Sequence, residues 1–190
     1  MRTPPPELAA ALTRAGEEIL TSPDLRLEDV ARMVGASRAK LYYYFAGLPD
    51  LHGYLVEQHL QEGARTIRDA VDPALDAPDR LHAVVRAAAA YLAERPGLCA
   101  GLLGDDAVGT RAGMLAASDA VVGTPLRELL DEGRADGSLR APDVATAVDS
   151  LMGAVLLAVL GRWRRGDDGA VATFASRVAD QVVSGLRSTP

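Results

Sequence analysis

The sequence is poor in several residue types, and each scarcity excludes a class of protein. It contains one cysteine, Cys99, so the chain can form no internal disulfide and no cysteine-based zinc cluster. His52 and His59 share a helical face, but no third ligand completes a metal site with them. No pair of carboxylates lies beside a histidine at helical spacing, and no glycine-rich phosphate loop follows a strand. We therefore expect a protein without catalytic residues, metal or cofactor.

Long apolar runs are also missing. The longest, LMGAVLLAVLG at residues 151–161, has about half the length that a membrane-spanning helix needs. The opening segment, MRTPPPELAAAL, lacks the basic stretch and apolar core of a signal peptide. These features predict a soluble, cytoplasmic protein with no membrane partner.

Positive charge is not in excess. The formal net charge is −6, and residues 1–60 hold six Lys or Arg against eight Asp or Glu. The only lysine in the chain is Lys40. Any binding to a polyanion must therefore come from a local patch rather than from the surface as a whole.

The chain is rich in helical patterns. Apolar residues recur at helical spacing, and neither strand alternation nor an internal repeat occurs, so we predict an all-α protein of about nine helices. The expected helices cover residues 7–20, 27–34, 38–45, 49–71, 80–94 (capped by Asp79), 96–103, 108–135 with a break at 123–125, 142–164 and 170–186.

Residues 26–51 contain two short helices joined by a tight turn, which is the layout of a helix-turn-helix. Ala31 is small where the two helices would cross, and Gly35 occupies the turn, where a positive φ favours glycine. Ser37 is a suitable N-cap for the second helix. Leu41 and Phe45 lie on one face of that helix, which we expect to be buried.

Half of the aromatic residues of the chain lie in that second helix, as Tyr42–Phe45. So short a helix cannot bury three consecutive tyrosines, so some of them must face outward beside Arg38 and Lys40. Tyrosine hydroxyls reach phosphate oxygens, and a guanidinium can pair with O6 and N7 of guanine. The pattern alone is compatible both with DNA binding and with an ordinary corner of a helical bundle.

Residues 27–51, LEDVARMVGASRAKLYYYFAGLPDL, strongly resemble the DNA-binding domain of the TetR family of bacterial transcriptional regulators. In that family a short helix ends in Ala-Gly-Val-Ser, followed by Leu-Tyr-Tyr-His-Phe, a small turn and Lys-Glu-Glu-Leu. Gly35–Ser37, Leu41–Tyr43, Phe45 and Leu51 follow this pattern. The resemblance implies a DNA-binding domain at residues 1–47 and a ligand-binding and dimerisation domain at residues 48–190.

Carried over to this sequence, the resemblance implies DNA contacts from Arg26, Ser37, Arg38, Ala39, Lys40, Tyr42, Tyr43 and Tyr44. Arg38 and Ala39 would meet base edges. Tyr44 replaces the usual histidine and would either contact DNA or pack against the domain. Leu48 replaces a lysine that commonly contacts phosphate, and Arg26 replaces the usual capping Thr or Ser. The alternative is therefore a helical dimer that binds a ligand or partner and has lost DNA binding.

A DNA-binding domain with so few basic residues would bind DNA weakly on its own, so we expect a homodimer. The dimer places two recognition helices in successive major grooves of a palindromic operator. Residues 143–164 are apolar on nearly all sides, and residues 170–186 carry one apolar stripe suited to pack beside them. We expect the dimer to form through these two helices, as the family resemblance also implies. The alternative is that both belong to the core of one subunit.

The resemblance further implies a small-molecule effector whose binding releases the DNA, so the expected function is that of a ligand-responsive repressor. Aromatic and sulfur-containing side chains suit an adaptable apolar pocket, although each is equally suited to the core. The candidates are Tyr91, Cys99, Met114, Met152 and Trp163. The scarcity of charge on these helices favours an apolar or amphipathic effector. His82, on an apolar helix face, is expected to be a structural histidine with a partner.

Overall fold

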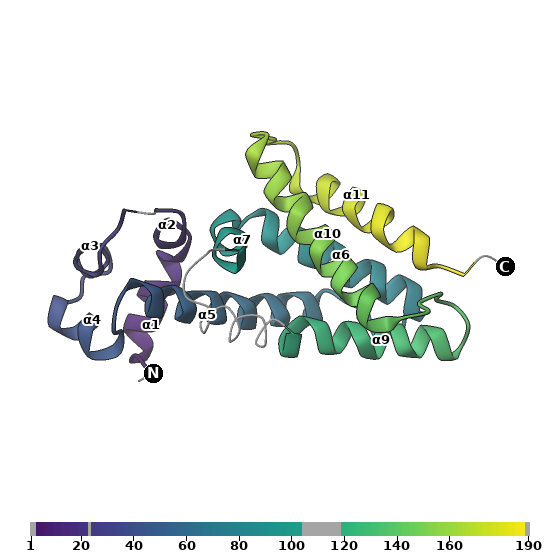
Figure 1. Cartoon of the computed structure of the whole chain (residues 1–190), viewed down its shortest axis with the longest axis horizontal. Coiled ribbons are helices and arrows are strands. Elements are labelled where there is room, and N and C mark those ends of the chain that lie inside the picture. Colours follow the sequence, from purple (N-terminus) through teal and green to yellow (C-terminus); the bar gives the residue numbers. More distant parts are fainter. Residues whose placement is uncertain (1–2, 23, 104–118, 189–190) are drawn as a thin grey trace. The chain divides into compact units, whose positions relative to one another are not determined.

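The chain is all-helical wherever its structure is described. The computed structural model describes residues 3–22, 24–103 and 119–188, and within them it has ten α-helices (Figure 1). Among these residues the extended pairing is limited to an isolated bridge between Leu139 and Arg187. The predicted all-α class is confirmed.

The N-terminal helices are short except for the last of them: α1 (Pro6–Arg14), α2 (Gly16–Thr21), α3 (Leu27–Met33), α4 (Arg38–Tyr44) and α5 (Leu48–Asp69). The remaining elements are α6 (Ala77–Ala93), α7 (Pro96–Leu103), a π-helical turn (Asp119–Gly123), α9 (Thr124–Ala135), α10 (Val144–Arg164), α11 (Val171–Val183) and a 3-10 turn (Ser184–Leu186).

The chain forms two compact units. One comprises Met1–Leu60 and Arg95–Ala117, and the other comprises Gln61–Glu94 and Ser118–Pro190. Helix α5 contributes its first residues to the first unit and its last residues to the second. Compactness does not decide which segment binds DNA or a ligand, so the domain boundary after residue 47 stays a prediction.

The single helix predicted over residues 7–20 is wrong, because the chain departs from regular helix at Ala15, where ψ is 0°. The break separates α1 from α2 and is followed by the buried Gly16. A Cβ on Gly16 would lie 2.5 Å from Nε2 of His59, so α2 can approach α5 this closely only with glycine at that position. Spacing of apolar residues does not reveal this contact, since it depends on a residue far along the chain.

Helix α6 begins earlier than predicted. Asp76, rather than Asp79, is its N-cap, and Oδ1 of Asp76 accepts a hydrogen bond of 2.9 Å from the backbone N–H of Asp79. Pro78 lies in the first turn, where backbone N–H groups make no hydrogen bond within the helix, so the lack of an N–H on proline costs nothing there. The predicted break at residues 123–125 is confirmed, because α9 begins at Thr124 after the π-helical turn.

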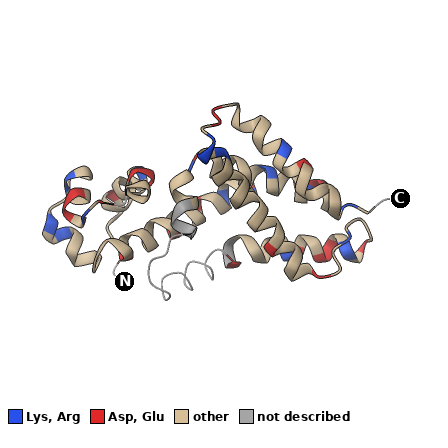
Figure 2. Cartoon of the chain, turned by 45° about the horizontal axis from the view of Figure 1, so that its top comes forward, with Lys and Arg blue, Asp and Glu red and all other residues tan. Residues whose placement is uncertain are grey.

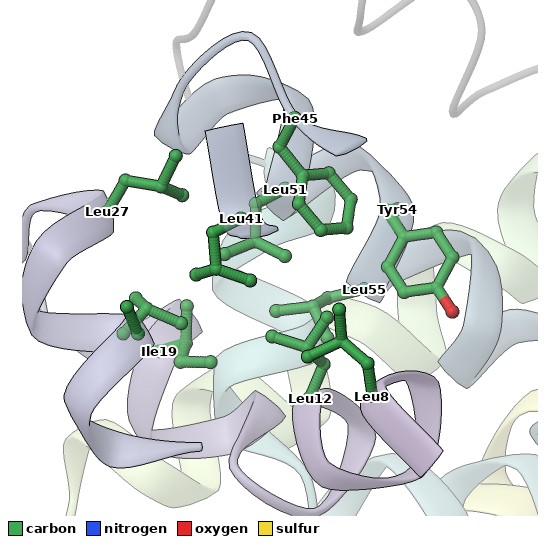
Figure 3. Close-up of a cluster of buried hydrophobic side chains, with 11 residues drawn as sticks. Leu8, Leu12, Ile19, Leu27, Leu41, Phe45, Leu51, Tyr54 and Leu55 are labelled. Atoms are coloured by element: carbon green, nitrogen blue, oxygen red, sulfur yellow. The ribbon is translucent and has the colours of Figure 1, made fainter. Parts of the chain in front are cut away.

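Helices α1 to α5 are held together by one buried apolar cluster (Figure 3). Its members are Leu8, Leu12, Ile19, Leu27, Val30, Ala31, Leu41, Phe45, Leu51, Tyr54 and Leu55. The rings of Phe45 and Tyr54 are tilted against each other with centroids 5.4 Å apart, and the Tyr54 hydroxyl points away from the cluster. Because every one of these five helices contributes a side chain, the cluster fixes α3 and α4 relative to the rest of their unit.

In the second unit α9, α10 and α11 all pack against α6 (Figure 1). His82 of α6 places Nε2 2.8 Å from Oδ1 of Asp180 on α11, so this histidine has the structural partner that we expected. Arg80 of α6 pairs with Glu132 of α9. Within the chain the apolar stripe of α11 packs mainly on α6 and to a lesser extent on α10. The pairing of the last two helices with those of a second subunit stays a prediction.

Candidate DNA-binding surface

The turn between α3 and α4 is closed by two backbone hydrogen bonds. The N–H of Ala36 donates to the carbonyl of Ala31 at 2.9 Å, and the N–H of Gly35 donates to that of Arg32 at 3.3 Å. This is a Schellman motif, which requires a left-handed residue just beyond the helix end. Gly35 supplies it with φ of +66°. The predicted glycine turn is therefore confirmed, and it directs the chain straight into α4.

Helix α4 is anchored at its start and on one face. Oγ of Ser37 accepts a hydrogen bond of 3.1 Å from the N–H of Lys40, as expected of an N-cap. The side chains of Leu41 and Phe45 are 0% exposed. Because these two residues hold one side of the helix in the core, the opposite side must face outward.

That outward side carries most of the predicted DNA contacts. Arg38, Ala39 and Lys40 are exposed, and Tyr42 and Tyr43 are 46% and 58% exposed. Tyr44 is half-buried and packs against the apolar cluster, with its ring edge-on to that of Tyr43 at 4.9 Å between centroids. The tyrosine run is thus divided between a surface pair and one residue that supports the domain.

An acidic side chain on α3 binds two of these surface residues. Nη2 of Arg38 lies 2.8 Å from Oε1 of Glu28, and the hydroxyl of Tyr42 donates to the same oxygen at 3.1 Å. The guanidinium of Arg38 also lies over the Tyr42 ring, 5.5 Å from its centroid. Sequence reasoning missed Glu28, because its neighbourhood depends on how α3 crosses α4.

The pKa of the Glu28 carboxyl lies below its ordinary value. The largest cause is a hydrogen bond from its own backbone N–H, and the Tyr42 hydroxyl and the Arg38 charge act in the same direction. Burial opposes them. Glu28 is therefore a carboxylate at neutral pH, and it keeps a negative charge beside the first turn of α4.

The two departures from the family pattern have clear structural settings. Arg26 occupies the N-cap of α3, but a guanidinium cannot accept a hydrogen bond, and the Asp29 carboxylate instead accepts from the Arg26 N–H at 3.0 Å. The Arg26 side chain is left exposed. Leu48 is half-buried against the apolar cluster at the start of α5. It strengthens the core at a position where a lysine would add positive charge.

Charge on this surface is nearly balanced. Residues 26–51 contain four basic and three acidic side chains. The exposed basic residues are Arg26, Arg32, Arg38 and Lys40. Figure 2 shows basic and acidic positions close together in the N-terminal helices. Arg32 pairs with Asp29 and Arg38 pairs with Glu28. A local basic patch at this surface therefore stays a prediction.

Solved structures of bacterial regulators share this architecture. The fatty acid degradation regulator FadR from Bacillus halodurans superposes with a TM-score of 0.79 at 18% identity, over 99% of this chain and 100% of that one. The regulator PfmR from Thermus thermophilus, of the TetR family, gives 0.68 at 24% identity, over 97% and 100%. The chain has the fold of TetR-family regulators. A third structure, the regulator FadR from Bacillus subtilis in complex with stearoyl-CoA, gives 0.75 at 17% identity, over 95% and 98%.

No protein-family model matches the sequence, and no curated protein matches it either. The likeness to TetR-family structures therefore concerns the fold. What this chain binds has to be argued from its own residues.

The predicted ligand-binding residues of this TetR-like chain have very different settings. Tyr91 of α6 is buried, and its hydroxyl donates to Oε2 of Glu62 at 3.3 Å. Cys99 of α7 is fully buried, and burial, followed by the charge of Glu17, raises the pKa of its thiol to about 12. Met152 is half-buried and Trp163 is 56% exposed, both on α10.

Met114 lies outside the described residues. Tyr91, Met152 and Trp163 belong to the second unit and Cys99 to the first. An exposed tryptophan does not line an enclosed pocket within its own subunit. The assignment of these five residues to an effector site stays a prediction.

Helix α10 carries a second surface of interest. Its inner face, formed by Ala147, Val148, Leu151, Val155 and Val159, is buried within the subunit. Between residues 151 and 161 the helix is apolar on its other sides as well, and Leu157 is 66% exposed there, whereas Asp149 and Arg164 are exposed nearer its ends. Among the described residues it is the one helix long and apolar enough to cross a membrane, yet only 22% of its most apolar stretch is buried. Helices of soluble proteins pass the same test, and α10 packs on α6 and α9.

Proposed function

We propose that the protein is a ligand-responsive transcriptional regulator, acting in the cytoplasm as a repressor, that binds a palindromic operator as a homodimer. The observation that carries this proposal is the outer face of α4. It presents Arg38, Lys40, Tyr42 and Tyr43 to solvent, on a helix that follows a closed helix-turn-helix corner. The TetR-like fold supports the same reading.

Within that surface the residues divide into base-reading and phosphate-binding roles. Arg38 and Ala39 lie in the first turn of α4, the end of a recognition helix that enters the major groove. Lys40 and Tyr43 suit phosphate contacts because their polar groups stand on the exposed side, whereas Tyr42, whose hydroxyl donates to Glu28, would meet the bases with its ring. Arg26, at the start of α3, is proposed as a further phosphate contact. Ser37 and Tyr44 act mainly as the helix cap and as a support for Tyr43.

Dimerisation follows from the small number of cations. One helix-turn-helix domain, on whose surface basic and acidic residues nearly balance, binds a polyanion weakly. Two such domains double the number of phosphate contacts. With about eight such contacts per dimer, the logarithm of affinity would fall with the logarithm of salt concentration at a slope of about −7. We propose that α10 supplies the interface, because its central stretch at residues 151–161 is apolar and exposes Leu157 in the single subunit. Helix α11 would take part through its outer side.

The effector is proposed to be apolar or amphipathic, in keeping with the few charges on α6 and α10. Stearoyl-CoA is the first compound to test, because one of the similar structures is a complex with it. A ligand that binds the folded protein raises its melting temperature by mass action, so thermal shift is a direct screen. An effector should also weaken operator binding in the same protein sample.

The DNA-binding function is tested by selecting bound sequences from random double-stranded DNA at low salt. Binding to the enriched sequence is then measured by mobility shift. The expected product is a two-fold symmetric site. Arg38→Ala should cost about 1–3 kcal/mol of operator binding and relax preference at one base position. Lys40→Ala should weaken all sequences alike. Equal losses at all sequences for both variants would contradict the assigned roles.

Two observations favour a second candidate function. Leu48 packs into the apolar cluster where the family pattern has a phosphate-binding lysine, and residues 1–60 are net acidic. Such a protein would still form a dimer and would bind a ligand or a partner, but it would not bind DNA. Failure of the wild type to enrich any sequence at low salt, with a dimer still present in solution, would favour that function.

A further inference from the structure

We infer that Glu28 is a specificity-determining residue, which positions Arg38 for a base edge and withholds it from the phosphate backbone. This inference rests on the proposed function. It concerns a side chain on α3 that has no expected role of its own in DNA contact. Its evidence is the shared contact of Glu28 with Arg38 and Tyr42.

The geometry restrains the Arg38 guanidinium from two directions. Glu28 Oε1 holds one edge through Nη2 at 2.8 Å, and the Tyr42 ring covers one face at 5.5 Å from its centroid. Tyr42 is itself held in place, because its hydroxyl donates to the same carboxylate oxygen at 3.1 Å. A guanidinium has five N–H donors, so one edge can bind Glu28 while others remain for a guanine.

Restraint of this kind matters because Arg38 is otherwise a long, exposed side chain. Its side chain is 70% exposed, whereas that of Glu28 is 32% exposed. An ion pair this exposed contributes little to the stability of the fold. Its consequence lies in recognition instead, since an arginine already oriented loses less side-chain freedom when it binds a base.

The negative charge has a second effect on the same arginine. A guanidinium paired with a carboxylate releases fewer counterions from DNA than an unpaired one, so Glu28 weakens sequence-independent binding. Contact with a base edge is affected less, because Glu28 leaves the other donors of Arg38 available. Discrimination between operator and other DNA therefore increases, at some loss of total affinity.

The test compares Glu28→Gln with Glu18→Gln. Glu18 is an exposed glutamate of α2, and its replacement changes the net charge by the same amount. Binding of each full-length dimer is measured to the selected operator and to a scrambled duplex over a range of salt concentrations. Circular dichroism and melting confirm that each variant is folded.

For Glu28→Gln we expect tighter binding to scrambled DNA, by up to about 8-fold per subunit at 0.1 M salt, and a salt slope more negative by about 0.9 per subunit. Operator affinity should change less, so the specificity ratio falls. Glu18→Gln should leave that ratio unchanged. In the Arg38→Ala background, Glu28→Gln should have no more effect than Glu18→Gln, because the residue acts through Arg38.

Equal effects of Glu28→Gln and Glu18→Gln on the ratio would overturn the inference and leave the DNA-binding function intact. An effect of Glu28→Gln that persists in full without Arg38 would also overturn it. If the wild type selects no operator, the proposed function itself fails. These outcomes are separate, because the first two require a wild-type protein that binds its operator.

Discussion

Leu157→Asp on the outer face of α10 should separate the dimer into folded subunits. Leu157 is 66% exposed in the single subunit, so two-thirds of its side chain remains to be covered by a partner. Complete burial of a leucine contributes about 1.5–3 kcal/mol, and two-thirds of that is about 1–2 kcal/mol. A two-fold interface uses the residue twice, which gives about 2–4 kcal/mol per dimer.

This loss corresponds to a dimer dissociation constant raised about 30- to 700-fold, and the buried aspartate charge adds to it. Sedimentation velocity over a dilution series measures the constant directly. The matched control is Leu75→Asp, because Leu75 is also exposed, at 39%, but lies in the connection between α5 and α6. A Leu157→Asp protein that sediments as the wild-type dimer would refute this placement of the interface.

Three further changes test the fold around the proposed surfaces. Gly35→Val should lower the free energy of unfolding by about 1–2 kcal/mol, because φ is +66°, and Gly35→Asn should lower it less; urea titration measures both. Glu17→Ala should lower the free energy of unfolding by about 1–3 kcal/mol, because the Glu17 carboxylate accepts hydrogen bonds from the N–H groups of Gly97 at 2.7 Å and Leu98 at 3.2 Å. The control Glu18→Ala should show no comparable loss. The pKa of Asp143 is lowered by hydrogen bonds from Thr146, first from its backbone N–H and then from its side chain. The Asp143 carboxylate therefore stabilises the folded state fully above the unfolded pKa of about 4. This stabilisation is lost as the pH falls through the lower pKa of the folded state. Unfolding curves between about pH 5 and pH 2 should therefore converge for wild type and Asp143→Asn, and parallel curves would contradict this assignment.

The parts of the fold that depend on neighbouring residues were predictable. Ser37 caps α4, Gly35 closes the turn before it, and Leu41 and Phe45 face the core, all as expected. Each of these features is decided within one or two helical turns, where hydrogen-bonding groups and apolar spacing can be read directly. The divided tyrosine run follows from the same logic, because three consecutive residues of a helix cannot share one face.

Other features depend on contacts between distant segments. The break at Ala15 accompanies the approach of Gly16 to His59, and the stripe of α11 packs on α6. Trp163, a candidate for an apolar pocket, is exposed on α10. None of these can be read from periodicity, since an apolar side chain gives the same pattern whether its partner is its own core, another helix or another subunit.

The sequence by itself determined the helical class, the closed corner at residues 34–37 and the outward side of α4, because local hydrogen bonding and apolar spacing govern all three. Only the tertiary structure decided that Glu28 holds Arg38 and Tyr42, and that Leu157 of α10 stays exposed. The angle at which α3 crosses α4 and the packing around α6 place those side chains. Both are set by the summed contacts of whole helices rather than by any short stretch of residues.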